Sequence, residues 1–441
     1  MITCEPKIEV ALLQNYRESK ITLNDNFYLP GGRTAAKTLN IQGIAGKVLL
    51  SDTSGKKVAL RKEIFLAAQE NSTFTLDVKI GIDFHWQRNI QQTFRGNIIL
   101  RSNTDSSFHL INEIPLEDYL ASVISSEMSA QAPLAFLKAQ TITARSWLAA
   151  MLERKKRNSK ELHTDHESFN EIIRWHDTND HSGFDVCADD HCQRYQGITQ
   201  ITSANVSAAI QATRGLYLVY DNKICDARYY KSCGGRTEIF STAWEDKSFP
   251  YLQSVTDHSV EHTAINSEDD AEKWLRDKPP AYCNTQDKTL LDEILPSFDQ
   301  ETIDFYRWRV SYTREELEEI LYKKSGIDFG TLQNLTAVKR GPSGRISELK
   351  IEGTKKTVIV GKELEIRRWL SPTHLLSSAF VVSSQHSEDG AIERFILDGG
   401  GWGHGVGLCQ IGAAVMAKKG FSAEDILAHY FSGTKLQKLY E

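Results

Sequence analysis

The sequence predicts an α+β protein with several domains, and three observations support this class. Residues 1–105 carry alternating or β-branched runs separated by Gly, Asn and Asp, a pattern typical of strands. Residues 115–151 carry apolar side chains at spacings of three and four, a pattern typical of helices. Residues 257–384 alternate strand-like and helix-like segments. A chain of 441 residues with this composition favours two to four domains.

Composition and charge argue against two classes of function. The formal net charge is -6 at pH 7, which gives no whole-molecule basis for binding nucleic acid. No stretch approaches the roughly 20 apolar residues that a membrane-spanning helix needs, so we expect no membrane span. The opening residues, MITCEPKIEVALLQ, lack a basic segment followed by an apolar run. We therefore expect no secretory signal peptide in this sequence.

The β-rich region over residues 1–105 gathers no cluster of catalytic side chains, so we expect an accessory role for it. The stretch SFHLINEIPLEDYL then predicts a strand that leads directly into a first helix. In that helix, Leu116, Leu120, Val123 and Glu127 follow at spacings of four, three and four, so they share one face. Glu127 thus occupies a position where a leucine would be expected.

Two properties of this position suit Glu127 to acid catalysis. Burial disfavours the charged carboxylate and raises its pKa, and the negative end of the helix dipole acts in the same direction. A carboxyl group that keeps its proton near neutral pH is what a general acid requires. The alternative is that Glu127 is exposed at a frayed helix end, since unpaired buried Glu is rare.

A second helix is expected from about Pro133 to Lys155, with Ser129 as a possible N-cap and Pro133 in the first helical position. Its packing face is formed by Leu134, Leu137, Thr141, Ala144, Leu148 and Met151. Arg145 is flanked by small residues, and we expect it to point toward the same turn as Glu127.

The segment HSGFDVCADDHC is a candidate zinc site. Zinc takes thiolate and imidazole ligands in tetrahedral geometry, and two Cys with two His within twelve residues would complete such a site. The ligands would be His181, Cys187, His191 and Cys192. A full set of four ligands favours a structural ion. A Cys187–Cys192 disulfide and two free thiols remain as alternatives, although seven cysteines argue against a fully paired framework.

Two glycine-containing stretches are candidates for ligand binding. In SCGGRTE, the glycines allow a ligand to approach the backbone, and Ser232, Arg236 and Thr237 are candidates to bind sugar hydroxyls; a plain β-turn is the alternative. In GWGHGVGLCQIGA, His404 lies between glycines and Gln410 begins a helix of small residues. This stretch fits neither a dinucleotide fingerprint nor a phosphate loop. A tight turn with a structural His is the alternative.

Three stretches resemble the SpoIID/LytB family, named for stage II sporulation protein D and an amidase enhancer. They are EDYLASVISSEM, PLAFLKAQTITARSWLA and GWGHGVGLCQIGA, the last resembling the family signature GWGHGVGMSQYGA. The SCGGRTE stretch resembles a further family motif, Ser-rich Gly-Gly-x-Thr-Glu. The sequence departs from these patterns at Cys233 and Cys409, where small or hydroxyl residues are commoner.

The resemblance implies a catalytic domain that is split around an insertion. The expected parts are a β-rich accessory region at 1–105, the first catalytic part at 106–256, an inserted α+β domain at 257–384 and the C-terminal catalytic part at 385–441. The resemblance also strengthens the zinc interpretation, because some members bind zinc through a His, Cys and His-Cys arrangement.

The resemblance further implies a lytic transglycosylase that acts on peptidoglycan glycan strands, with Glu127 as its single catalytic acid. Such an enzyme cleaves the MurNAc–GlcNAc bond and leaves a 1,6-anhydro sugar, preferably on strands without stem peptides. Glu117, Asp118 and Glu238 are candidates for a second carboxylate. The expected sugar-binding residues are Arg145, Ser232, Arg236, Thr237, His404 and Gln410. The expected location is the cell envelope or another extracytoplasmic compartment.

Two other functions are compatible with these residues. The first is a non-enzymatic, glycan-binding activator of a cell-wall amidase, which the amidase-enhancer branch of the family suggests. The second is a zinc hydrolase built on the His/Cys segment. A hydrolase needs an open coordination position on the metal, and four protein ligands would leave none.

Overall fold

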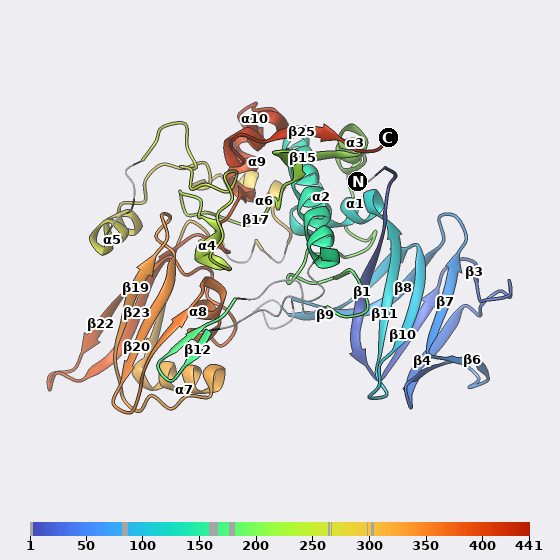
Figure 1. The fold of residues 1–441 in the computed structure, drawn as a ribbon, viewed down its shortest axis with the longest axis horizontal. Helices are drawn as coiled ribbons and strands as arrows, with labels where there is room; N and C mark the ends of the chain where they lie inside the picture. Colours follow the sequence, from blue (N-terminus) through green and yellow to red (C-terminus); the bar gives the residue numbers. More distant parts are fainter. Residues whose placement is uncertain are drawn as a thin grey trace. The chain divides into compact units, whose positions relative to one another are not determined.

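A computed structural model describes residues 3–81, 87–157, 166–175, 181–262, 265, 267–297, 299–300 and 304–441 (Figure 1). Helices and strands are mixed along the chain, which agrees with the predicted α+β class. The chain forms two compact units. The first comprises Met1–Gln131, Thr178–Leu216 and Lys438–Glu441, and the second comprises Ala132–Asp177 and Tyr217–Gln437. The domain boundaries expected from the sequence stay a prediction.

The first unit contains two six-stranded sheets, with strand orders β14-β1-β11-β10-β7-β3 and β6-β5-β4-β2-β8-β9. Their strands are β1 (Lys7–Tyr16), β2 (Glu18–Leu23), β3 (Phe27–Tyr28), β4 (Thr38–Ile44), β5 (Lys47–Asp52), β6 (Lys57–Arg61), β7 (Glu63–Ala68), β8 (Thr73–Ile80), β9 (Arg88–Arg95), β10 (Asn97–Ser102), β11 (Phe108–Pro115) and β14 (Val186–Cys187). These strands confirm the expected β-rich character of residues 1–105. The labels in Figure 1 locate most of them.

Two helices of the first unit, α1 (Leu116–Glu127) and α3 (Ala204–Thr213), pack against each other. The predicted passage from a strand into the first helix is confirmed, since β11 ends at Pro115 and α1 begins at the next residue. Glu117 and Asp118 lie in the first turn of α1, where negative charge complements the helix dipole. Leu116, Leu120 and Val123 are buried, as the spacing predicts.

The second unit contains the long helix α2 (Leu134–Arg157) and several smaller sheets. Its other helices are α4 (Phe240–Ala243), α5 (Glu268–Asp277), α6 (Lys288–Ile294), α7 (Arg314–Ser325), α8 (Glu363–Trp369), α9 (Gln410–Lys418) and α10 (Ala423–Tyr430). Its strands are β12 (His166–Ser168), β13 (Glu171–Ile173), β16 (Lys223–Ile224), β17 (Tyr229–Tyr230), β18 (Arg307–Thr313), β19 (Leu332–Arg340), β20 (Ile346–Gly353), β21 (Thr357–Gly361), β22 (Phe380–His386), β23 (Ile392–Gly400) and β24 (Leu408–Cys409). Strands β15 (Leu216–Tyr220) and β25 (Lys435–Lys438) begin or end at its boundary.

The predicted helix starts in the second unit are confirmed in two cases and wrong in one detail. The sequence alone also predicts two helix starts from capping-box patterns, Thr313 with Glu316 and Ser422 with Asp425. Both capping boxes form, at the starts of α7 and α10, which confirms these predictions. The predicted cap at Ser129 is wrong, because α2 begins at Leu134, directly after Pro133. Among the described residues, no helix combines the length and apolar character needed to cross a bilayer.

Candidate functional site

Glu127 is the last residue of α1, and its carboxylate contacts a segment distant in sequence. The side chain is half-buried, between the two situations that the sequence left open. The next residue, Met128, has an extended backbone, which ends the helix. Glu127 Oε1 accepts a hydrogen bond of 3.0 Å from the backbone N–H of Arg194. This donor favours the charged carboxylate, whereas the C-terminal end of the helix disfavours it.

The segment 193–196 is attached to α1 at more than this one point. Tyr119 Oη donates a hydrogen bond of 3.0 Å to Gln193 Oε1. The ring of Tyr195 stacks on that of Tyr119, with centroids 5.2 Å apart. Burial raises the pKa of Tyr119, so its phenol stays neutral and keeps its proton for this bond. The position of the Glu127 carboxylate is therefore tied to the chain that immediately follows Cys192.

The four predicted zinc ligands lie together in the first unit, just before that segment. His181 Nε2 is 3.3 Å from Cys192 Sγ, and His191 Nδ1 is 3.7 Å from the same sulfur. One potential ligand atom from each of His181, Cys187, His191 and Cys192 lies within 4.8 Å of the others. A tetrahedral zinc ion with bonds of about 2.0–2.3 Å separates nitrogen and sulfur ligands by about 3.6 Å. These four side chains therefore fit a four-coordinate metal ion.

The sheet explains why Cys187 is at this place. Strand β14 pairs in parallel with β1, and this pairing sets Cys187 opposite Ala11. The Cys187 side chain joins an apolar cluster with Ile99, Ile111 and Phe184. Hydrogen bonding from Cys192, helped by His181 and His191, outweighs burial and lowers the pKa of the Cys187 thiol to about 2. The thiolate form is the one that binds a metal.

In the second unit, the two glycine-containing stretches lie side by side. Strands β17 and β24 pair in parallel, and an additional bridge joins Ser232 to Trp402. Ser232 N donates to Trp402 O at 3.0 Å, and Trp402 N donates to Ser232 O at 2.8 Å. Gly407 has a φ of +85°, and a Cβ there would lie 2.2 Å from the Arg228 carbonyl oxygen. Glycine at this position is therefore required by both the backbone angle and the close approach of the Arg228 carbonyl, which directly precedes β17.

Gly407→Ala is expected to destabilise the second unit by more than about 3 kcal/mol, because it combines an unfavourable backbone angle with a clash against main-chain atoms. Gly420→Ala is the matched control. Its φ is +92°, but a Cβ at that position meets nothing within 4 Å. The control should therefore lose only the backbone contribution of about 1–2 kcal/mol. Urea unfolding of both variants measures the difference, and equal losses would contradict this description of Gly407.

His404 lies in an aromatic and cationic environment. Its ring is 5.3 Å from that of Tyr230 and 4.8 Å from that of Trp244, measured between centroids. His404 Nδ1 accepts a hydrogen bond of 3.1 Å from Val406 N, and the ring also bonds to the Tyr229 backbone. Burial and nearby arginines hold the pKa of His404 well below its usual range. The imidazole is therefore neutral, with its orientation set by the surrounding backbone.

The other predicted sugar-binding side chains are buried in the second unit; they are Arg145, Ser232, Arg236, Thr237 and Gln410. Arg236 bonds to Thr256 and forms an ion pair with Glu261 at 2.6 Å. Thr237 Oγ1 accepts from Val255 N at 2.8 Å. Their sugar-binding role, and the predicted approach of Arg145 to Glu127, stay predictions.

Two of the three candidate second carboxylates, Glu117 and Glu238, accept hydrogen bonds from residues of their own unit. Glu117 is buried and accepts hydrogen bonds from Gly215 N and Tyr440 Oη. Burial raises the pKa of Asp118. In the second unit, Glu238 is fully buried and accepts from Ser343 Oγ at 2.6 Å. Glu117 and Glu238 thus have clear structural partners.

A charge network reaches His404 through Trp244, whose ring contacts both His404 and Arg228. Arg228 stacks on Trp244, with its guanidinium carbon 3.9 Å from the ring centroid, and pairs with Asp226 at 2.9 Å. Arg154 pairs with the same carboxylate at 2.9 Å. Burial alone would raise the pKa of Asp226, but the two guanidinium groups outweigh it and lower that pKa to about 2.

Asp226→Asn is expected to lower the free energy of unfolding by about 3–5 kcal/mol at pH 7, because it removes the negative charge that the buried Arg228 and the half-buried Arg154 both face. The folded pKa is below the unfolded value of about 3.9, so the carboxylate stabilises the protein above pH ~4. This stabilisation, about 2 kcal/mol, is lost as pH falls from about 4 to about 2. Urea unfolding across this pH range should therefore show the variant approaching wild type.

Asp277→Asn provides the control for this measurement, since Asp277 forms an exposed pair with Lys273. Its effect should stay within about 0.5 kcal/mol at every pH. A gap between Asp226→Asn and wild type that does not change with pH would contradict the assigned charge network.

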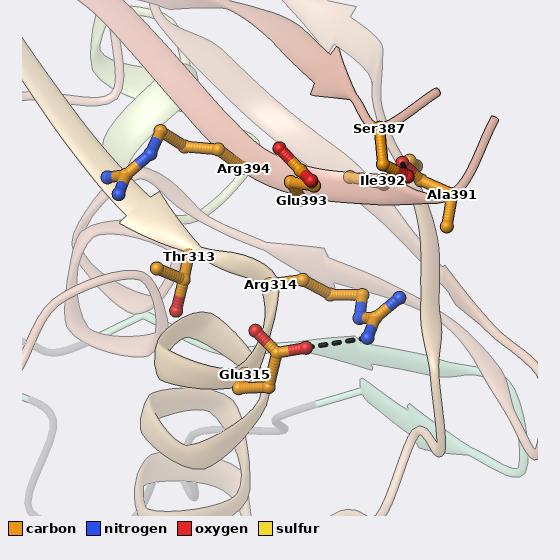
Figure 2. A pocket seen from close by; sticks show the side chains of 8 residues that line it. All are labelled: Thr313, Arg314, Glu315, Ser387, Ala391, Ile392, Glu393 and Arg394. Atoms are coloured by element: carbon orange, nitrogen blue, oxygen red, sulfur yellow. Dashed lines mark hydrogen bonds and ion pairs between the residues drawn. The ribbon is translucent and has the colours of Figure 1, made fainter. Parts of the chain in front are cut away.

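A surface pocket of about 470 Å³ lies elsewhere in the second unit, between β18, α7, β22 and β23 (Figure 2). It is lined by Thr313, Arg314, Glu315, Ser387, Ala391, Ile392, Glu393 and Arg394. Arg314 and Glu315 form an ion pair of 2.6 Å there. The lining includes none of the residues that the sequence singles out for chemistry, so we assign no catalytic role to this pocket.

Sequence reasoning missed several residues that the structure brings to these sites. The Arg194 backbone carries no motif signal. Tyr119 lies in the EDYLASVISSEM stretch, but nothing in that stretch predicts its bond to Gln193. Both roles depend on contacts between segments more than 60 residues apart. A second group, Cys233, Asp257, Cys283 and Cys409, gathers in the second unit. The four residues are far apart in the sequence, so no local pattern identifies this group. The departures from the family patterns at Cys233 and Cys409 were the one signal in the sequence that pointed to it.

Comparison with known families gives two matches. Residues 104–220 match the family described as stage II sporulation protein. Residues 238–407 match a family described as a domain of unknown function. The first match contains α1, α2, and the His/Cys cluster, and the second contains His404.

Individual relatives agree with the first match. The chain is 26% identical over 338 residues to stage II sporulation protein D of Bacillus amyloliquefaciens, covering 76% of this chain and 77% of that protein. It is 25% identical over 331 residues to the protein of that name from Bacillus subtilis, covering 74% and 76%. It is 24% identical over 333 residues to the amidase enhancer of Bacillus subtilis, covering 72% of this chain but 40% of that protein. These matches confirm the resemblance found in the sequence: the chain is similar to stage II sporulation protein D and to the amidase enhancer, and residues 104–220 match the family model.

Proposed function

We propose that this protein is a peptidoglycan lytic transglycosylase and that Glu127 is its catalytic acid. The observation that carries the proposal is the half-buried Glu127 carboxylate at the end of α1, bonded to Arg194 N beside the His/Cys cluster. A single carboxyl group, positioned by backbone and protected from full solvation, is suited to donate a proton to a glycosidic oxygen. The names of the relatives supply the connection to the cell envelope.

In this mechanism, Glu127 protonates the oxygen that links MurNAc to GlcNAc, and the bond from that oxygen to the muramic C1 breaks. The 6-hydroxyl of the same muramic residue attacks C1, and its proton passes to the Glu127 carboxylate. The enzyme returns to its starting state, no water is consumed, and the product carries a 1,6-anhydro ring. Ordinary glycosidases need two carboxylates at a set separation. Here one carboxylate suffices, because the substrate supplies the nucleophile.

The His/Cys cluster would hold zinc in a structural role. Zinc with two thiolate and two imidazole ligands has no open coordination position for activating water. Its contribution would be to hold residues 181–192 in place, and with them the Arg194 N–H that contacts Glu127. Arg145, Ser232, Arg236, Thr237, His404 and Gln410 remain the proposed sugar-binding set. Because five of the six are buried, their main contribution would be to shape the surface that a glycan meets.

The test is mass spectrometry of the products from purified glycan strands, with and without stem peptides. A lytic transglycosylase releases fragments ending in 1,6-anhydro-MurNAc, which are lighter by one water than hydrolysis products. Fragments with a reducing MurNAc end would assign the enzyme to hydrolysis instead. We expect the faster reaction on strands without stem peptides.

A second candidate function is a non-enzymatic activator of a cell-wall amidase that binds glycan, which the name of one relative favours. In that case Glu127→Gln would still bind glycan strands in a pull-down and would still raise the rate of a purified amidase. A transglycosylase would lose its own activity in the same variant. The two functions are therefore separated by one variant and two assays.

A further inference from the structure

The second unit contains a buried group of three thiols and one carboxyl that none of the roles above uses. Cys233 follows β17, Asp257 and Cys283 lie in loops, and Cys409 directly precedes α9. All four are almost inaccessible to solvent, with 0–3% of each residue exposed. One donor atom from each lies within 4.8 Å of the other three. Four segments separated by up to 176 residues thus converge on one point.

The contacts in this group resemble those around bound metal. Cys233 Sγ and Cys283 Sγ are 3.4 Å apart. The N–H of Cys233 points to Cys409 Sγ at 3.3 Å, and the N–H of Gly235 points to Cys233 Sγ at 3.3 Å. Backbone N–H groups directed at sulfur stabilise thiolates, and such outer contacts commonly accompany metal-bound sulfur.

Asp257 is oriented by neutral donors. Its Oδ2 accepts from Cys283 N at 2.8 Å, and its Oδ1 accepts from Tyr430 Oη at 2.5 Å. Each oxygen keeps a lone pair after one hydrogen bond. A carboxyl group and three thiols without a bound cation are costly to bury in any charged form, whereas a bound dication offsets part of that charge.

We propose that Cys233, Asp257, Cys283 and Cys409 bind a second zinc ion in the second unit. Zinc bonds of about 2.3 Å to sulfur and about 2.0–2.2 Å to oxygen place tetrahedral ligands about 3.5–3.8 Å apart. The Cys233–Cys283 sulfur distance is 3.4 Å, and no two ligand atoms of the group lie more than 4.8 Å apart. The expected ligand–ligand distances fall within this range. Four protein ligands make this ion structural.

The site would link the two glycine-containing stretches, because each stretch supplies one of its ligands. Cys233 belongs to SCGGRTE, and Cys409 belongs to GWGHGVGLCQIGA. These are the two positions at which the sequence departs from the family patterns, and both departures supply a thiol to the same point. Packing alone does not explain why both positions carry cysteine, since small residues would also fill a buried position.

The test is metal analysis of the full chain purified without chelator. Wild type should contain two zinc ions per chain if the His/Cys cluster is also loaded. The double variant Cys187→Ser, Cys192→Ser should keep one ion, and zinc X-ray absorption of that variant should show three sulfur neighbours at about 2.3 Å. Cys283→Ala should lose one ion. Cys225→Ala is the control, because Cys225 is equally buried in the second unit and belongs to neither group.

Three results would overturn the proposal. The first is an absence of zinc from the Cys187/Cys192 double variant, and the second is unchanged zinc in folded Cys283→Ala. The third is a Cys233–Cys283 disulfide found by non-reducing peptide mapping. If Cys283→Ala is insoluble, the sulfur count in the double variant decides alone. Because the readout is metal content, it is independent of transglycosylase activity and of the role of Glu127.

Discussion

Glu127→Gln should stop the release of 1,6-anhydro products from glycan strands, with the rate falling by about 10²- to 10⁴-fold. The amide has nearly the same shape as the carboxyl group and still accepts the Arg194 N–H bond through its oxygen. It has no proton to donate to a glycosidic oxygen, so the chemical step is lost while the local structure remains. Product release measured by mass spectrometry, with circular dichroism as a check on folding, provides the test.

Glu113→Gln is the matched control. Glu113 is another half-buried carboxylate of the first unit, placed on β11 and paired with Lys7 at 3.1 Å. Its substitution should leave turnover within about twofold of wild type, since surface ion pairs of this kind contribute little. If Glu127→Gln turns over glycan as fast as Glu113→Gln does, Glu127 is not the acid and the transglycosylase mechanism fails.

The second large effect is expected from removal of both thiols of the His/Cys cluster. Cys187→Ser, Cys192→Ser should lose zinc from the first unit and lower its free energy of unfolding by about 4 kcal/mol under conditions where zinc is about 1,000-fold above its dissociation constant. Residues 181–196 should become accessible to protease, because the metal would no longer hold them. Transglycosylase activity should fall as well, since Arg194 would no longer hold the Glu127 carboxylate.

The exposed Cys4→Ser provides a control for general effects of thiol removal and should change neither zinc content nor proteolysis. Cobalt substitution separates a structural from a catalytic ion. With a structural ion, the cobalt protein should keep both the rate and its pH dependence. A protein that resists protease and remains fully active after zinc is removed would exclude the proposed link between the cluster and Glu127.

Local features of the chain were predictable from sequence because they depend on neighbouring residues. The spacing of Leu116, Leu120 and Val123 identified α1 and placed Glu127 at its end. Capping residues located the starts of α7 and α10. Short spacing also brought His181, Cys187, His191 and Cys192 together, since ligands within twelve residues need only one loop to converge.

Burial and long-range contacts were decided by tertiary structure. Periodicity placed Glu127 on an apolar face, yet its half-burial and its bond to Arg194 depend on the segment 193–196. The SCGGRTE and GWGHGVGLCQIGA stretches look like binding loops in the sequence, because glycine and polar residues are typical of such loops. In the structure, Ser232, Thr237 and Gln410 are buried.

The sequence by itself determined the α+β class, the helix that ends at Glu127, the His/Cys cluster and the family resemblance. All of these are encoded in residue types at short spacing. Only the tertiary structure decided what contacts the Glu127 carboxylate and which of the scattered cysteines meet. Cys233, Cys283 and Cys409 occupy separate segments of the chain, and no local pattern specifies their meeting. Their convergence follows from packing of the whole second unit, in which each pairwise contact depends on all the others.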